Sequence, residues 1–317
     1  MRKLISIVIP AYNERDNIKA LVARLQGVFA ANPRYDFEAI VVENGSADDS
    51  MELLLAARKE DPRFKIVQLA RNFRFDGGLT AGLNYARGDA AVLMVADLQD
   101  PPELITEFIG KWEEGYENVY GIVTRRTGTS FLRRLNSQLF YLLANRLTNG
   151  MMPRNASDFR LADRRVYQVI NRMEERNRFV RGLFPWVGFR SIGIPHVRPP
   201  RTAGVSGAHT LKVLGLALKG ILAHSYVPLK AVGVLGLAMA AAGLAAAAAV
   251  LARALFLGGA LLDRAGLAAG LLLSTGLVTL CLGVIAEYLC LIYEEVKQRP
   301  NYVVARTEGF DDAQAAR

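Results

Sequence analysis

The first 125 or so residues of the 317-residue chain alternate between short apolar runs and longer amphipathic stretches. The apolar runs are brief, rich in Val and Ile and bounded by polar or turn residues, which predicts strands at Leu4–Ile9, Phe37–Val42, Lys65–Leu69 and Ala90–Val95. The stretches between them predict helices at Asn17–Ala31, Asp48–Arg58 and Gly78–Ala86. Strands that alternate with helices in this way predict an α/β fold with a doubly wound, mostly parallel sheet covered on both faces.

The pattern changes in the last third of the chain. Two uncharged apolar stretches, Ala231–Ala252 and Ala265–Ala286, are each long enough to cross a hydrocarbon core of about 30 Å as a helix. They predict a transmembrane hairpin with helices at about 231–255 and 265–288. Before them, apolar residues recur at helical spacing from Leu211 to Leu222, which predicts an amphipathic helix in the membrane interface, with a core-packing helix as the alternative.

Positive charge on both flanks of the hairpin predicts its orientation. The flanking residues are Lys212, Lys219, Lys230, Lys297, Arg299 and Arg306. Because basic loops stay in the cytoplasm, we expect a multi-pass protein of the inner (cytoplasmic) membrane with its globular domain and both termini cytoplasmic. The predicted organisation is a globular domain at 1–208, an interfacial helix at 209–228, the hairpin at 229–293 and a tail at 294–317. The Ala-rich first span favours packing against other helices, including those of a homo-oligomer.

The net charge indicates which classes of partner the chain can bind, and the cysteine spacing excludes a disulfide. The chain has 39 Lys+Arg against 30 Asp+Glu, and its formal net charge of +9 suits an anionic partner. With no nucleic-acid-binding signature visible, the membrane segments favour acidic lipid headgroups or a phosphorylated substrate. The two cysteines, Cys281 and Cys290, would lie about 13 Å apart along one helix, too far for a disulfide, and no histidine cluster accompanies them.

Polar residues follow the predicted strands at the edge of the sheet where ligands bind in such folds. Tyr12 and Glu14 come after the first strand, and can hold a flat base and its polar edge. Glu43 and Ser46 come after the second strand. These side chains can bind a base or ribose, or they can cap the next helix.

The fourth strand is followed by Asp97-Leu98-Gln99-Asp100-Pro101-Pro102-Glu103. Asp97 and Gln99 can turn oxygen atoms toward one site, and oxygen is the ligand that Mg²⁺ and Mn²⁺ prefer. Taken singly, an acidic turn before Pro-Pro is more often a helix start. Together with the polar residues after the other strands, it predicts a metal site for a nucleotide diphosphate.

The middle of the chain, from about 125 to 210, is rich in arginine. Most of these side chains are expected on solvated helix faces, but a few in a cleft would bind phosphate groups well, since guanidinium binds phosphate bidentately. Pro195–Thr210 is dense in Pro and Gly and predicts a loop.

The motifs in combination resemble the inverting family 2 glycosyltransferases of the GT-A fold. The similar branch contains dolichol-phosphate mannose synthase and bactoprenol glucosyltransferase. The matching runs are Ile7–Glu14, Glu43–Asp48, Ala70–Phe73, Leu79–Leu83, Ala96–Leu104, Ser157–Leu161, Arg181–Phe189, Ala286–Leu289 and Ile292–Pro300. The resemblance covers nearly the whole chain.

The resemblance implies roles for individual residues. The implied nucleotide-donor residues are Pro10, Tyr12, Glu14, Glu43, Ser46, Ala96 and Asp97, and Asp97 and Gln99 would hold Mg²⁺ or Mn²⁺. The implied acceptor-phosphate residues are Arg126, Arg160, Arg198 and Arg201. Asp97, Asp158, Arg126 and Arg201 are the implied catalytic residues. Asp158 would be a base, or would orient the acceptor or hold Arg160; an acceptor phosphate, already an anion, needs little base catalysis.

Several positions depart from the family's pattern. Relatives commonly have Asp-Ala-Asp where this chain has Val95-Ala96-Asp97, so one carboxylate near the metal is missing. Val123 replaces a common arginine, and Val205 and Gly207-Ala208 replace an acidic residue and a Lys-aromatic pair. These losses remove metal and phosphate contacts.

The resemblance implies transfer of a hexose from a nucleotide sugar, UDP-glucose first and GDP-mannose next, to polyprenyl (undecaprenyl or dolichyl) phosphate with inversion at the cytoplasmic membrane face. The alternatives are a family 2 enzyme with another membrane acceptor, and a non-catalytic membrane scaffold that keeps the fold.

Overall fold

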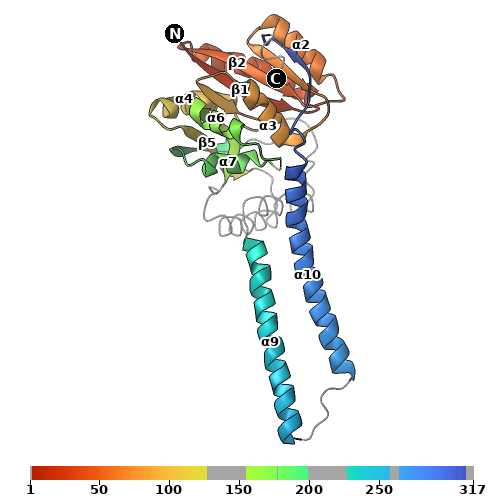
Figure 1. The fold of residues 1–317 in the computed structure, drawn as a ribbon. Coiled ribbons are helices and arrows are strands. Elements are labelled where there is room, and N and C mark those ends of the chain that lie inside the picture. The colour runs from red at the N-terminus through yellow and green to blue at the C-terminus, as the bar shows by residue number, and fades with distance from the viewer. Residues whose placement is uncertain (1, 127–154, 177, 199–226, 258–263, 312–317) are drawn as a thin grey trace. The chain divides into compact units, whose positions relative to one another are not determined.

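The computed structural model describes residues 2–126, 155–176, 178–198, 227–257 and 264–311 (Figure 1). The chain divides into two compact units. The first, called the sheet domain below, contains the residues up to Leu214 together with those from Arg299 onward. The second, called the helical unit, runs from Gly215 to Gln298.

The sheet domain is built on one mixed sheet, in which the described residues form eight strands in the order β7-β5-β6-β4-β1-β2-β3-β8. The strands are β1 (Lys3–Ala11), β2 (Tyr35–Glu43), β3 (Phe64–Leu69), β4 (Ala90–Leu93), β5 (Asn118–Arg126), β6 (Ala156–Asp163), β7 (Ser191–Arg198) and β8 (Val304–Glu308). Strands β3, β2, β1 and β4 are parallel neighbours. β6 runs antiparallel between β4 and β5, β7 runs parallel to β5, and β8 runs antiparallel to β3.

Helices cover both faces of this sheet. They are α1 (Arg15–Ala31), α2 (Ser50–Glu60), α3 (Arg74–Tyr85), α4 (Ile105–Glu113), α6 (Arg164–Arg172) and α7 (Val180–Trp186), with a short 3₁₀ turn η1 at Pro102–Leu104. Side chains alternate along β1: Ile5 and Ile7 pack in the cluster that contains α1 and α4, whereas Val8 packs in the cluster that contains α3, α6 and α7. All three residues are fully buried. The double cover explains why these strands are apolar on both faces.

The predicted α/β architecture is confirmed for the first 110 residues or so, where all four strands and all three helices occur within a few residues of their expected positions. The loop prediction from Pro195 onward was wrong over its first four residues, because β7 continues to Arg198. β7 ends the strand order, and a proline is tolerated on an edge strand because no neighbour needs its missing N–H.

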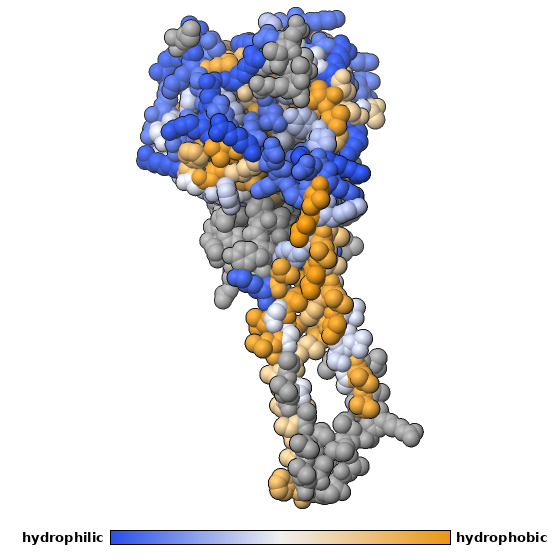
Figure 2. Space-filling model, in the orientation of Figure 1, coloured by the Kyte–Doolittle hydropathy of each residue, from blue (hydrophilic) through white to orange (hydrophobic). Residues whose placement is uncertain are grey.

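The helical unit contains two long helices, α9 (Val227–Leu257) and α10 (Arg264–Val296). Figure 2 shows hydrophobic residues gathered on both, and Leu280, Leu282 and Leu289 of α10 are exposed. Among the described residues, one segment is long and apolar enough to cross a membrane, Ser274–Val296. That segment overlaps the second predicted span, so the first span, at about 231–255, and with it the hairpin, stay predictions. Nearly all of the predicted interfacial helix at 209–228 lies outside the described residues.

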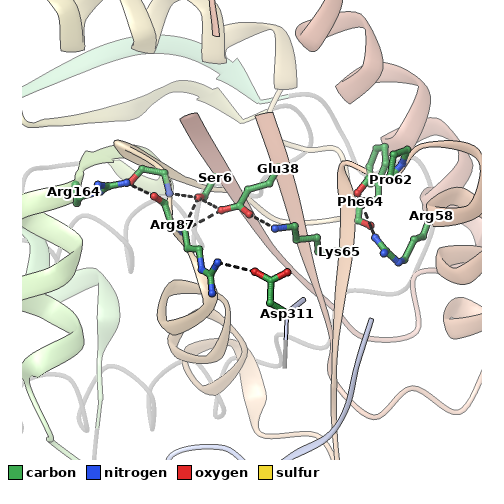
Figure 3. A network of polar contacts seen from close by, with 10 residues as sticks. Ser6, Glu38, Arg58, Pro62, Phe64, Lys65, Arg87, Arg164 and Asp311 are labelled. Carbon is green, nitrogen blue, oxygen red and sulfur yellow. Dashed lines mark hydrogen bonds and ion pairs between the residues drawn. The ribbon is translucent and has the colours of Figure 1, made fainter. Parts of the chain in front are cut away.

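A buried polar network ties three strands of the sheet to the turn between α3 and β4 (Figure 3). The Ser6 hydroxyl donates to Glu38 Oε1 at 2.5 Å, and Lys65 Nζ donates to Glu38 Oε2 at 2.7 Å. The backbone N–H of Arg87 donates to Glu38 Oε1 at 3.0 Å, and that of Gly88 donates to Ser6 Oγ at 2.7 Å. Each partner of the buried Glu38 carboxylate is therefore a donor, which offsets the cost of removing its charge from water.

We predict that Glu38→Ala destabilises the sheet domain by about 3 kcal/mol, the lower end for breaking a buried ion pair, because Lys65 keeps some contact with solvent. Thermal unfolding of the purified protein in detergent would measure the loss. Glu114→Ala is the matched control, since it removes an exposed partner of Lys111 and should barely change Tm. Equal Tm values for the two variants would contradict the role of the network.

Candidate active site at the carboxyl edge of the sheet

Hydrogen bonds join the loop after β1 to the loop after β2. The backbone N–H of Asn13 donates to Ser46 Oγ at 3.0 Å, and that of Ala47 donates to Asn13 Oδ1 at 2.9 Å. The backbone N–H of Glu14 donates to Ser50 Oγ at 3.1 Å. Asn13 has φ +55°, a left-handed conformation that asparagine adopts more readily than most residues. The two loops therefore form one structured rim.

The predicted donor residues lie along this rim and differ in exposure. Pro10 belongs to β1, and Tyr12, just past the strand end, is 45% exposed. Glu43 ends β2, is 1% exposed and accepts a hydrogen bond from the backbone N–H of Ser46. The Tyr12 ring is thus accessible to a ligand, whereas the buried Glu43 side chain holds the loop after β2 through its hydrogen bond with Ser46.

The loop between β3 and α3, residues 70–73, packs against the same rim together with Arg74, the first residue of α3. The backbone N–H of Phe73 donates to Asn44 Oδ1 at 2.9 Å, and Asn44 Nδ2 donates to the Arg74 carbonyl oxygen at 2.8 Å. Gly45 has φ +71°, and a Cβ there would lie 2.7 Å from the carbonyl carbon of Arg71. Only glycine fits this close approach, so three strand-end loops meet at one place.

The loop after β4 presents the expected oxygen atoms. Leu98 adopts φ +56°, and the backbone N–H of Gln99 donates to Asp97 Oδ1 at 3.2 Å. Val95, half-buried, stands where a second carboxylate was expected. Among the described residues, no group of three or more His, Cys, Asp or Glu side chains is arranged to hold a metal ion. One carboxylate and one amide suit Mg²⁺ or Mn²⁺ by donor type, but a nucleotide diphosphate would have to supply most of the charge.

The neighbouring Asp100 is fully buried and takes part in a different set of contacts. Arg198 Nη2 donates to Asp100 Oδ2 at 2.9 Å, and the Ser157 hydroxyl donates to Asp100 Oδ1 at 3.4 Å. His196 Nε2 lies 3.5 Å from the same Oδ1. Asp100 therefore joins the β4 loop to the first residues of β6 and the last residues of β7.

Asp158 and the arginines around it form the next layer. Arg181 of α7 binds the Asp158 carboxylate through two nitrogens, with Nε–Oδ1 at 2.7 Å. The buried Arg160 instead donates to the backbone carbonyl oxygens of Ser157 and Asp158, and its guanidinium lies 4.3 Å from the centre of the Phe184 ring. The Asp158 carboxylate thus holds Arg181, not Arg160.

Burial and the charges of these residues change the pKa values of Asp158 and Arg160. Burial alone would raise the pKa of Asp158, but the charge and hydrogen bonds of Arg181, with the charges of Arg160 and Arg198, hold it below its ordinary value. Burial lowers the pKa of Arg160 to about 10, which leaves it a cation at neutral pH. Asp158 is consequently an ionised group with little tendency to accept a proton.

Sequence reasoning missed Asp76, in the first turn of α3. Its Oδ1 accepts the backbone N–H of Val180 at 3.0 Å, so it holds the start of α7. Burial, together with the charge of Asp158, raises the pKa of Asp76 to about 6, against the opposing effects of the Val180 N–H, Arg181 and Arg178. An acid in the first turn of a helix is ordinary, and no signal near it in sequence pointed to Asp158 or α7.

The chain matches known proteins over nearly its whole length. The family model described as "Glycosyl transferase family 2" matches residues 6–170, about half of the chain. The Bacillus subtilis glycosyltransferase YkcC is 40% identical over 307 residues, which cover 97% of this chain and 95% of the relative. The chain belongs to glycosyl transferase family 2.

Two further likenesses concern named enzymes. The SfII prophage-derived bactoprenol glucosyl transferase of Shigella flexneri is 32% identical to this glycosyltransferase over 303 residues, covering 96% of this chain and 98% of the relative. Among solved structures, glucosyl-3-phosphoglycerate synthase from Mycobacterium tuberculosis, in complex with Mn²⁺, UDP-glucose and phosphoglyceric acid, is similar with 19% identity and a TM-score of 0.47. That likeness covers 69% of this chain and 78% of the other.

The sheet brings most of the predicted site residues of this glycosyltransferase to one edge. The donor-side residues border the joined loops, and Ala96, Asp97 and Gln99 form the β4 loop. Arg198 ends β7, in register with Arg126 at the end of β5. Arg201 lies outside the described residues. The assigned roles stay predictions, and Arg181 and Asp76 join the candidate residues.

We predict that Asp76→Asn stabilises the protein at neutral pH and has little effect at low pH. Because the pKa of Asp76 is about 6 when folded and 3.8 ordinarily, the wild-type protein loses stability as pH rises from about 4 to 6. Asparagine keeps an acceptor for Val180 and cannot ionise, so above pH 6 the gain reaches at most about 3 kcal/mol. Tm measured in detergent from pH 4.5 to 8 would test this; a difference that does not grow with pH would refute it.

Proposed function

We propose that this glycosyltransferase moves a hexose from a nucleotide sugar, UDP-glucose first, to a polyprenyl phosphate, with inversion, at the cytoplasmic face of the membrane. The bactoprenol glucosyl transferases of Shigella flexneri and its phage SfV, each 32% identical over 95% or more of this chain, support this acceptor class. The long apolar segment Ser274–Val296 also suits an enzyme whose acceptor is a lipid.

The buried Asp100 network is the observation that carries the proposal. It links the loop of Asp97 and Gln99 to Arg198 and to the strand of Asp158. The loop with the oxygen atoms that suit a metal–diphosphate complex is therefore joined to the two strands that carry Arg160 and Arg198. A transfer between a nucleotide diphosphate and a phosphate needs both kinds of environment at one edge of a sheet.

In the proposed reaction, an oxygen of the acceptor phosphate forms a bond to the anomeric carbon while the bond from that carbon to the nucleoside diphosphate breaks. An in-line displacement on an α-linked donor gives a β-linked product. When bound by Asp97 and Gln99, Mg²⁺ or Mn²⁺ neutralises charge on the departing diphosphate. Asp158 fixes Arg181, and the arginines orient the acceptor phosphate.

We further infer that α9 and α10 form a two-helix membrane hairpin with both ends in the cytoplasm. The apolar part of α9 that is described is short, Leu229–Gly243, so the argument relies on the whole apolar stretch in the sequence. Lys230, Lys297 and Arg299 on the two flanks support the orientation. Labelling of single cysteines placed in the 258–263 connection and at residue 312, in intact and opened cells, would test it.

Transfer of radiolabel from UDP-glucose, GDP-mannose and other nucleotide sugars to undecaprenyl phosphate in detergent tests the proposed reaction. Labelled lipid that forms with one donor and disappears with EDTA would support both the acceptor and the metal. Transfer only to a different lipid or to a protein would show that the proposed polyprenyl-phosphate acceptor is wrong. Absence of transfer to every acceptor tried would favour the alternative of a non-catalytic scaffold.

We predict that Asp97→Asn lowers turnover by about 10²-fold or more, since it removes the charged oxygen donor at the departing diphosphate. Asp36→Asn is the control, an exposed aspartate of β2 that should leave turnover unchanged. Val95→Asp adds the carboxylate that relatives have, and a large rise in rate would mean that the native site is impaired. Wild-type turnover in Asp97→Asn would remove Asp97 from the mechanism.

A further inference from the structure

The chain returns to the sheet domain after the second long helix. Residues 304–308 form β8, which pairs antiparallel with β3. The backbone N–H of Ala70, just past β3, donates to the Val303 carbonyl oxygen at 2.9 Å. We call residues 301–311 the C-terminal segment. It belongs to the same compact unit as the candidate active site, although the whole helical unit lies between them in sequence.

The C-terminal segment supplies part of the hydrophobic core. Tyr302, Val304 and Phe310 pack against a buried cluster that includes Leu69 and Tyr85, and the rings of Phe310 and Tyr85 are 4.9 Å apart. Polar contacts add to this packing. Lys65 lies 5.3 Å from the centre of the Phe310 ring, and Arg87 pairs with Asp311 at 3.1 Å (Figure 3). The segment is therefore anchored along its length.

The start of the segment contacts α3 and the loop before it. Asn84 Nδ2 donates to Tyr302 Oη at 2.9 Å, and Phe73 packs in the same cluster as Tyr302. A Cβ placed on Gly77 would lie 3.1 Å from the Asn301 carbonyl oxygen. Asn301 Nδ2 in turn donates to the Glu175 carbonyl oxygen at 2.9 Å.

Residues 70–77 are thus held from two sides. Asn44 and Gly45 contact them from the donor rim, and Asn301, Tyr302 and Val303 contact them from behind. Ordering a loop residue costs about 1–2 kcal/mol, so a loop that is already ordered spares the ligand that cost on binding. Arg74, at φ +63°, is in a conformation that its surroundings must maintain.

We propose that Asn301, Tyr302 and Val303 are positioning residues for the nucleotide donor, holding residues 70–77 in the conformation that binds a nucleoside diphosphate. This inference rests on the proposed function. Donor affinity would then depend on a segment that directly follows the proposed membrane hairpin in the chain. The membrane anchor would thus be covalently joined to the segment that supports the donor site. We expect acceptor binding, which would use the arginines near Asp158, to be unaffected by changes in the segment.

Tyr302→Phe and Asn301→Ala in the full-length protein test the proposal. The first removes the hydrogen bond from Asn84 of α3, the helix that begins with residues 74–77, and the second removes the bond to the Glu175 carbonyl oxygen, while the pairing of β8 with β3 does not involve either side chain. A truncation at Pro300 would remove core residues and would confuse positioning with folding. Arg306→Ala is the matched control, an exposed residue of β8 whose partner is Glu308 on the same strand. Calorimetry with UDP and with GDP gives donor affinity, and transfer kinetics give the two KM values.

We expect each positioning variant to weaken binding of the preferred nucleotide about 3- to 10-fold, the weight of one hydrogen bond, and to raise donor KM similarly. Acceptor KM and the Arg306→Ala control should stay at wild-type values. Hydrogen exchange should also slow in residues 70–77 and 301–304 when the nucleotide binds. Lower Tm with unchanged nucleotide affinity would overturn the proposal, because it would show a purely structural role.

The two proposals fail in different ways. If the wild-type protein binds a nucleoside diphosphate but transfers no sugar to polyprenyl phosphate, the proposed function fails, and the nucleotide affinities of the variants still decide the role of the segment. If the wild-type protein binds neither UDP nor GDP, both proposals are overturned.

Discussion

The buried carboxylate of Asp100 is the interaction on which the candidate site depends. It has no exposure to solvent, and its hydrogen-bond donors Arg198 and Ser157 come from the ends of two other strands, with His196 Nε2 3.5 Å away. A charge in such a place is stable only when donors surround it, so the β4 loop, the start of β6 and the end of β7 have to be built together. The same contact sets the position of Asp97 and Gln99, three and one residues earlier in the chain.

Two other carboxylates beside this network have opposite protonation tendencies. Arg181 holds the pKa of Asp158 below its ordinary value, whereas burial and the charge of Asp158 raise that of Asp76 to about 6. Groups with strongly shifted pKa values concentrate at functional sites. Burying an acid that resists ionisation adds nothing to the stability of a fold. Asp158 is suited to holding an arginine in place. Asp76 holds the start of α7, and with it the helix that carries Arg181.

The sheet also explains how a chain interrupted by the helical unit builds a single sheet domain. Its last strand, β8, follows the long apolar helix and covers β3, so that the short β8 is the edge strand on that side of the sheet. Aromatic residues of the same segment complete a hydrophobic cluster against α3. The domain therefore includes chain from both sides of the helical unit, and a boundary drawn at residue 208 describes only its first part.

The sequence by itself determined the first half of the sheet and the place of the site. Strand and helix periods are local properties, so β1 to β4 and their helices were predictable, and with them the positions of Tyr12, Glu43 and Asp97 at strand ends. The later strands were not predicted, because they carry charged or polar residues among their apolar ones, such as Arg160 in β6 and Arg306 in β8, and only their pairing with neighbours shows them to be strands. Nor could the motif after β4 show which of its two aspartates pairs with an arginine. Only the tertiary structure, by bringing Arg198 and Ser157 to Asp100 and Val180 to Asp76, decided the partners of these carboxylates, because such partners come from residues distant in the chain.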